Sequence, residues 1–572
     1  MRLRNILSRR RRDGKADPID AAATTAVPVD VPAPAYIFKL PDDVIYELFE
    51  NAALVYPPRA IVMMPASAHA VRHTDTLLGW IILTHICRRW RSIGLSATLA
   101  PLWARVVCLS WEPSVATELA SRARGHPISI DLTRYNGVFG EGYNTLWPLE
   151  EWVLENIHKA GVLVAPSAVL LNRLSERRLV LPELRELHLG GRHVSDEDLL
   201  ILWEAPGLQS ATLSRVLLPP HMARGLRVLQ LTIATFRMRL VAVHDFLRAC
   251  SSLSTLDVTI TGEWTHIDFS NEPVPGSFNH SEQAQWDRRV HLDQLKHAKI
   301  AVSVDQTVAD LLQPIITPPD LSLHLVFSSG YSKDPQSRSR LILGTCAKEL
   351  DRDLYDTLEL RISESPTAYN TLHIRLSSSS PLISASCELE ISTSDADIRD
   401  DTLVSLPSYM HTAAPLIRYL KFDASTADAI NTDATFGALG RALTGVTELQ
   451  LANMDYMLTA AYVRALRHFK PIPILPALKI VRVSAAQISS VPQLYQTRQW
   501  WDAVVSALEA RKGAGVAVLD CLQLDGEWTG EGGWEKDEEK EGMEELKHQG
   551  LVEKVDHRHR RWASLAAPQR IC

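Results

Sequence analysis

Residue types that bind metals or act as nucleophiles are present, but their spacing does not bring them together. The seven cysteines form no Cys-x-x-Cys pair; they are Cys87, Cys108, Cys250, Cys346, Cys387, Cys521 and Cys572. Such scattered cysteines favour neither a disulfide framework nor a zinc site, and a reducing compartment fits them best. His557 and His559 stand two residues apart in a charged segment that offers a metal no rigid frame. We therefore expect no bound metal.

The short motifs of common enzyme classes are also absent. The sequence has no His-Glu-x-x-His zinc motif, no Gly-x-x-x-x-Gly-Lys-Ser/Thr phosphate loop and no Gly-x-Ser-x-Gly nucleophile elbow. Gly513-Ala514-Gly515 follows a helical stretch and lacks a third glycine, so a helix end explains it better than a nucleotide site. We expect a protein that is not an enzyme, with no catalytic residue and no cofactor. An enzyme with catalytic groups dispersed in the sequence stays open as an alternative.

Composition indicates an ordinary soluble protein. The 572 residues are 46% hydrophobic and 22% charged, with a formal net charge of -7. Nothing in this balance points to nucleic acid, and the most apolar stretch, residues 77–87, is shorter than the ~20 residues of a membrane span. We expect a cytoplasmic or nuclear protein that binds neither nucleic acid nor a membrane. A basic N-terminal segment could be an import signal, a transit peptide or a solvated tail: Arg2, Arg4, Arg9, Arg10, Arg11, Arg12 and Lys15.

Ordered structure is expected to begin after a disordered leader of residues 1–35, which is basic and then rich in Ala and Pro. A helix starts near Leu40, because Pro41 suits a first helical position and Asp42 and Asp43 favour the positive helix end. Apolar residues then recur at helical spacing: Val44, Ile45, Leu48, Phe49 and Ala52. The face that they form must be covered.

A second helix is expected after an insertion loop at residues 57–75, where Pro57, Pro58 and Pro65 end the first helix. The stripe of this second helix is Leu78, Ile81, Ile82, Ile86, Arg89, Trp90 and Ile93. Leu102 and Trp103 follow a further turn-prone stretch and could close a small core.

The order of these residues resembles the F-box, especially as it occurs in large fungal F-box families. The resemblance rests on Leu40-Pro41 with Ile45, Leu48 and Phe49, on Ile86-Cys87-Arg88-Arg89-Trp90-Arg91 and on Leu102-Trp103, and it continues from Ser121 to Leu132. It assigns residues 36–108 to an F-box. Compact F-boxes lack the long insertion that separates the first two helices here.

The resemblance implies that this region binds a Skp-type adaptor protein and, through it, a cullin. Position by position, it implies an adaptor-binding set of Leu40, Pro41, Ile45, Leu48, Phe49, Ile86, Cys87, Trp90, Leu102 and Trp103.

A repeat begins after residue 180, where Leu184-x-x-Leu187-x-Leu189 recurs. Further units begin at residues 226, 253, 417, 446, 478 and 519, with a weaker one at Leu208-x-x-Ala211-x-Leu213. Residues 196–204, 241–250 and 434–443 can supply helices between the strands, and strand-like runs at 321–325, 358–362, 372–376 and 389–391 lack the full pattern. Apart from the gap between the units at 253 and 417, start-to-start intervals run from 18 to 41 residues and are more variable than those of regular leucine-rich repeats.

We therefore predict an α/β fold in which a helical F-box precedes an irregular solenoid resembling leucine-rich repeats, with disordered termini. An α/β segment at 109–180 links the F-box to a repeat domain at 181–526, and residues 527–572 form a charged tail, a short exposed helix or a docking site for a basic partner. A two-layer α/β domain with parallel strands is the alternative.

The residues between the repeat leucines should face solvent, because alternate strand side chains point to opposite sides. They predict a mixed sheet face that leans basic and favours acidic protein segments, or that only keeps the sheet soluble. The candidate partner-binding residues are Arg227, Arg418, Tyr419, Lys421 and Arg482. The F-box resemblance, together with a repeat domain that could hold a target protein, implies a substrate-recruiting subunit of a Skp/cullin/F-box ubiquitin ligase, with an interaction scaffold outside ubiquitination as the alternative.

Overall fold

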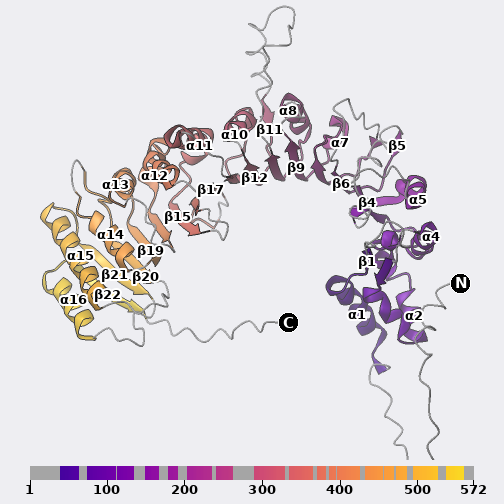
Figure 1. Cartoon of the computed structure of the whole chain (residues 1–572), viewed down its shortest axis with the longest axis horizontal. Coiled ribbons are helices and arrows are strands. Elements are labelled where there is room, and N and C mark those ends of the chain that lie inside the picture. The colour runs from indigo at the N-terminus through magenta and orange to yellow at the C-terminus, as the bar shows by residue number, and fades with distance from the viewer. Residues whose placement is uncertain are drawn as a thin grey trace, which may run out of the picture. The chain divides into compact units, whose positions relative to one another are not determined.

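The fold is described from a computed structural model of the chain (Figure 1). The described residues are 39–62, 74–110, 112–133, 148–165, 178–190, 203–234, 240–261, 289–303, 305–328, 334–364, 370–381, 385–393, 396–424, 432–454, 456–468, 472–485, 494–525 and 536–558. The predicted leader and the N-terminal arginines lie outside them. The chain divides into a unit of residues 1–57 and 78–99, here called the helical module, and a unit of residues 58–77 and 100–572, here called the sheet unit.

Three helical elements form the described part of the helical module. They are α1 (Asp42–Val55), the 3-10 helix η3 (Gly79–His85) and α2 (Arg88–Gly94). The start of α1 confirms the sequence prediction, with Pro41 before it and two aspartates in its first turn. The prediction of one continuous second helix is wrong, because Cys87 is extended (φ -158°, ψ 175°) and separates η3 from α2. Apolar residues continue across this break, which hid it from the sequence pattern.

The insertion contains secondary structure where a loop was predicted. Strand β1 (Arg59–Val62) pairs antiparallel with β2 (Thr74–Leu77), and the residues between them lie outside the described chain. These strands belong to the sheet unit, as do α3 (Ala100–Ala104), η4 (Val107–Leu109) and α4 (Pro113–Arg122).

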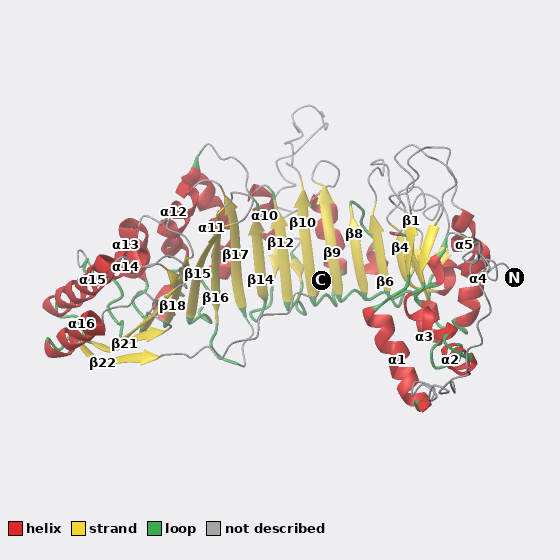
Figure 2. Ribbon diagram, turned by 60° about the horizontal axis from the view of Figure 1, so that its bottom comes forward, coloured by secondary structure: helices red, strands yellow, loops and turns green. Residues whose placement is uncertain are grey.

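One large sheet of 16 strands dominates the sheet unit, and Figure 2 shows its strands side by side. In spatial order the strands are β22 (Val552–Arg558), β21 (Leu519–Asp525), β20 (Ile480–Ala485), β19 (Glu448–Met454), β18 (Tyr419–Ala424), β15 (Thr357–Glu364), β16 (Asn370–Ser377), β17 (Ser386–Thr393), β14 (Ser322–Phe327), β12 (His297–Val302), β10 (Thr255–Thr261), β9 (Val228–Ala234), β8 (Ser210–Ser214), β6 (Glu186–Gly190), β4 (Ala160–Ala165) and β3 (Ile128–Asp131). All neighbouring pairs are parallel except the two that β16 makes. Two small parallel pairs are separate: β5 (Leu179–Val180) with β7 (Trp203–Glu204), and β11 (Val290–His291) with β13 (Ile315–Ile316).

Helices alternate with the strands and lie along one face of the sheet (Figure 1). They are α5 (Pro148–Asn156), α7 (Pro220–Ala223), α8 (Leu240–Ala249), α10 (Asp305–Leu312), α11 (Pro335–Leu350), α12 (Ala396–Ser405), α13 (Thr432–Ala442), α14 (Tyr456–Ala465), α15 (Leu494–Gly513) and α16 (Lys536–His548), with short 3-10 turns η6 (Ile157–Lys159), η7 (Leu406–Tyr409) and η8 (Ala414–Leu416). Strand residues alternate between buried and half-exposed, so one face packs on the helices and the other is open.

All eight predicted Leu-x-x-Leu-x-Leu units form strands of this sheet, and their spacing has a physical cause at the strand start. In the unit of β9, Leu226 closes a turn by donating its N–H to the carbonyl of Ala223 (3.1 Å). Arg227 and Val228 then both donate to the Gln209 carbonyl, so two residues occupy one position of the ladder. Leu229 is thereby returned to the buried face beside Leu226, although a regular strand would place residues three apart on opposite faces.

The same double hydrogen bond repeats at the residue directly before a strand, here called the pre-strand residue. Eight pre-strand carbonyls accept two successive N–H groups from the next repeat: those of Arg185, Gln209, Arg227, Ser254, Asp356, Arg418, Thr447 and Lys479.

The sheet also extends beyond the predicted limits 181–526, with β3 and β4 before them and β22 after them. In the predicted charged tail, α16 packs Gly542 against the ring of Trp501 and buries Leu546. Helices predicted at 241–250 and 434–443 are confirmed, whereas Trp203 and Glu204, predicted as helical, form β7.

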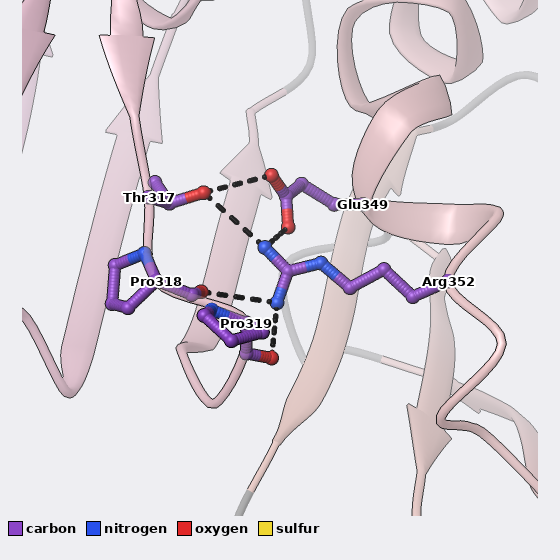
Figure 3. A network of polar contacts seen from close by, with 5 residues as sticks. All are labelled: Thr317, Pro318, Pro319, Glu349 and Arg352. Carbon is purple, nitrogen blue, oxygen red and sulfur yellow. Dashed lines mark hydrogen bonds and ion pairs between the residues drawn. The ribbon is translucent and has the colours of Figure 1, made fainter. Parts of the chain in front are cut away.

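The three strands β15, β16 and β17 form an antiparallel meander in the parallel sheet. Helix α11 must therefore connect β14 to a strand three places away, and α12 connects β17 to β18 in the same way. A polar network holds the end of α11 (Figure 3). Arg352 forms an ion pair with Glu349 and donates hydrogen bonds to Thr317 and to the carbonyls of Pro318 and Pro319. It ties the crossover helix to the chain that leads into β14.

The close turns between repeats predict a specific glycine requirement. A Cβ on Gly445 would lie 2.0 Å from the carbonyl oxygen of Pro415, so the backbone would have to shift. Gly445→Ala should lower the free energy of unfolding by about 1–3 kcal/mol, as measured by chemical denaturation. Gly513→Ala is the matched control, because a Cβ there meets no atom within 4 Å. Equal stability of the two variants would contradict this packing.

Candidate protein-docking surfaces

Aromatic rings build the small core of the helical module. Phe49 on α1 packs with Trp80 on η3 and with Trp90 on α2, each at a ring-centroid distance of 6.0 Å. Gly94 lies so close that a Cβ there would be 2.7 Å from the Thr84 methyl group. This core joins two chain segments, residues 39–57 and 78–99, across the insertion.

Large apolar side chains are left exposed around that core. Eight of the thirteen exposed large hydrophobic residues in the described chain lie in the helical module: Val44, Leu48, Leu54, Val55, Tyr56, Leu78, Ile82 and Ile86. Val44, Leu48 and Val55 follow one helical stripe of α1, and Ile82 and Ile86 stand four apart. Exposed apolar surface concentrated in this way is typical of a protein interaction site.

The structure separates the predicted adaptor-binding residues into three groups. In the first group, Pro41, Leu48 and Ile86 are exposed, and Leu40 and Cys87 are half-buried. The second group forms the core of the module: Ile45, Phe49 and Trp90. These three can support the surface only by holding its helices in place.

The third group consists of Leu102 and Trp103. The prediction that they close the core of the F-box region is corrected by their position. Both are buried in α3 of the sheet unit, and the guanidinium of Arg122 lies 4.7 Å from the Trp103 ring centroid. Sequence reasoning left Ile82 and Leu78 out of the surface set. Helical spacing from Ile86 could have indicated Ile82, whereas the break at Cys87 was not readable.

An arginine fixes the start of α1 against α2. Arg89 donates from Nε to Asp42 Oδ1 at 2.9 Å and from Nη2 to the carbonyl of Leu40 at 2.6 Å, and it forms an ion pair with Asp42. At the other end of α1, the Tyr56 carbonyl accepts the N–H of Trp80 at 3.0 Å. The helix that carries Val44 and Leu48 is therefore held at both ends.

The open face of the large sheet carries charges in register. One row of neighbouring strand positions alternates in sign over much of its length: Asp257, Lys299, His324, Glu388, Arg375, Glu359, Lys421, Gln450 and Arg482. Opposite charges on adjacent strands stabilise a sheet by about 0.2–1 kcal/mol per pair. The face is mixed, as predicted: this row carries four Lys or Arg residues and three carboxylates, and the sequence analysis overlooked the carboxylates on β15 and β17, Glu359 and Glu388.

Three of the five predicted partner-binding residues are engaged within the sheet. Lys421 pairs with Glu359, Arg482 pairs with Glu448 at 2.6 Å, and the Tyr419 hydroxyl donates to Gln450. Arg227 and Arg418 are instead exposed pre-strand residues at the amino-terminal edge of the sheet. A partner can reach these two guanidinium groups without breaking an ion pair.

Side chains of the types that bind metals or act as nucleophiles are spread over the described residues. The described residues hold no group of three or more His, Cys, Asp or Glu placed for a metal ion. Burial raises the pKa of the Cys250 thiol to about 12, and it raises the pKa of Cys346 and Cys387 well above the ordinary value. These thiols stay protonated at neutral pH and are poor nucleophiles. Within the same residues, no helix combines the length and apolarity needed to cross a membrane.

Comparison with known protein families and curated proteins does not identify a relative of this chain. No protein-family model matches the sequence, and no curated protein is significantly similar to it.

The division between core and surface makes a stability prediction. Trp90→Ala should cost about 3–5 kcal/mol, since it removes a ring that is only 2% exposed from a small core. Ile82→Ala should change stability by less than about 0.5 kcal/mol, because the Ile82 side chain is 56% exposed. Thermal unfolding followed by tryptophan fluorescence measures both. A folded Trp90→Ala protein with wild-type stability would mean that this ring is not part of the core.

Proposed function

We propose that this chain is a substrate-recruiting F-box subunit of a Skp/cullin/F-box ubiquitin ligase. In this proposal the helical module binds a Skp-type adaptor, and the open face and amino-terminal edge of the sheet unit hold a target protein. The chain itself makes and breaks no covalent bond. Ubiquitin transfer is carried out by other subunits, in the cytoplasm, the nucleus or both.

The observation that carries the proposal is the exposed apolar surface of the helical module. Leu54 and Val55 are 74% and 85% exposed, and Leu48 and Ile82 add apolar area from two different elements. A module this small gains little stability from its own core. Its exposed apolar surface therefore favours a stably bound protein partner. The F-box-like residues support a Skp-type adaptor as that partner, because Leu40-Pro41 and the run Ile86 to Arg91 resemble the F-box family.

The sheet unit supports the second half of the proposal by its architecture. We propose that its turn, strand and helix units are degenerate leucine-rich repeats stacked as a solenoid. Their hydrogen-bonded pre-strand residues and one-sided helices leave a wide strand face free for a protein partner. Because the strand charges alternate in sign over much of the row on the open face, recognition would select a partner by its charge arrangement more than by net charge.

Adaptor binding should depend on exposed residues of the module. Leu48→Asp combined with Ile82→Asp should weaken the binding of a purified Skp-type adaptor at least tenfold, since interface anchors commonly contribute ~2 kcal/mol or more. The full-length protein should stay folded. Val404→Asp is the matched control, because Val404 in α12 of the sheet unit is 40% exposed, the same as Leu48.

Undiminished binding by the double variant would refute the assignment of the surface. Binding without any ubiquitination of proteins that copurify with the chain would favour an interaction scaffold instead.

Target recruitment should depend on Arg227 and Arg418, two exposed arginines at the amino-terminal edge of the sheet, of which Arg418 makes one long hydrogen bond to the Gly445 carbonyl. Arg227→Glu with Arg418→Glu should reduce the recovery of acidic target proteins in proximity labelling, while adaptor binding stays at the wild-type level. Lys348→Glu with Arg467→Glu is the control, because these exposed cations lie on helices α11 and just after α14. An unchanged set of labelled proteins in the first variant would move the target site away from this edge.

A further inference from the structure

The helical module is assembled from two chain segments that residues 58–77 of the other unit separate. Its exposed apolar side chains come from both segments: Val44 and Leu48 from the first, Ile82 and Ile86 from the second. A partner that covers these four side chains together requires a fixed placement of α1 against η3 and α2. Phe49 fixes the middle of α1, and the Tyr56 carbonyl fixes its end.

The start of α1 depends on a polar contact. Pro41 provides no side-chain cap for this helix. Arg89 reaches back across 47 positions of sequence and bonds to both Asp42 and the Leu40 carbonyl. A planar guanidinium can direct Nε and Nη2 to these acceptors at once, which a lysine ammonium at the end of a flexible stem does less well. Asp42 also lies in the first turn, where a negative charge favours the helix.

We propose that Arg89 is a positioning residue, which sets the first turn of α1 so that Val44 and Leu48 form one binding surface with Ile82 and Ile86. This inference rests on the proposed adaptor binding. The Arg89 and Asp42 side chains are 40% and 62% exposed, so solvent screens the pair and its contribution to overall stability is small. The ion pair instead changes the fraction of molecules in which α1 is placed for binding. The apparent affinity for the partner is proportional to that fraction.

The test compares Arg89→Ala with Arg88→Ala in the full-length protein. Arg88 is the neighbouring exposed arginine and has no hydrogen-bond or ion-pair partner among the described residues, so both variants lose the same charge. Association and dissociation of a purified Skp-type adaptor are measured by surface plasmon resonance. Relative to Arg88→Ala, Arg89→Ala should associate about three- to tenfold more slowly, with an unchanged dissociation rate and an unchanged melting temperature.

A second pair of variants tests the same contact from the other side. Asp42→Asn should slow association relative to Asp43→Asn, because Asp43 has no such partner among the described residues. Adding Asp42→Asn to Arg89→Ala should cause no further slowing, since the contact is already lost. Arg89→Lys should recover part of the association rate.

The outcomes separate the possible roles of Arg89. Equal association rates for Arg88→Ala and Arg89→Ala would overturn the inference and leave the proposed function intact. Faster dissociation of Arg89→Ala would mean that this arginine touches the adaptor directly, and a lowered melting temperature would mean that it acts on overall stability; either result also overturns a positioning role. A wild-type protein that binds no adaptor would remove the proposed function and, with it, this inference.

Discussion

At eight strand starts of the sheet, one carbonyl oxygen accepts two successive N–H groups, and this constraint determines which side chains of the next strand are buried. Without that double hydrogen bond, Leu226 and Leu229 would face opposite sides, and the helices would have no continuous apolar face to cover. With it, three apolar residues of a unit point the same way and the intervening residues point to solvent. The sheet can therefore grow to 16 strands with helices of very different length on its covered face.

The helical module obeys a different constraint, because it has too little interior to bury its own apolar residues. Phe49, Trp80 and Trp90 fill the core, which leaves Leu48 and Ile82 in water. The described part of the sheet unit shows the opposite pattern: most of its large apolar residues are buried, and its open face carries ion pairs such as Lys421 with Glu359 and Arg482 with Glu448. A sheet unit with a well-covered core, joined to a module with exposed apolar residues, is the physical basis of the proposed recruiting role.

Apolar periodicity predicted the α/β class and the eight repeat strands, and the local signal of Pro41, Asp42 and Asp43 predicted the start of α1. Periodicity could not reveal that Cys87 interrupts the second helix, since apolar residues continue across the break. Nor could it assign Trp103 to the sheet unit, because a buried tryptophan next to the F-box-like run reads equally well in either unit. The pairing of Lys421 with Glu359 was hidden for another reason: these residues are 62 positions apart and meet only through strand order.

Calorimetric titration of a Skp-type adaptor into the full-length protein at several temperatures tests the central claim most directly. Covering the apolar residues of the helical module should give a one-to-one complex with a clearly negative heat-capacity change, because burial of apolar surface is its source. A complex with a heat-capacity change near zero would contradict an apolar interface. The absence of any binding heat at every temperature and at high adaptor concentration would contradict the account as a whole.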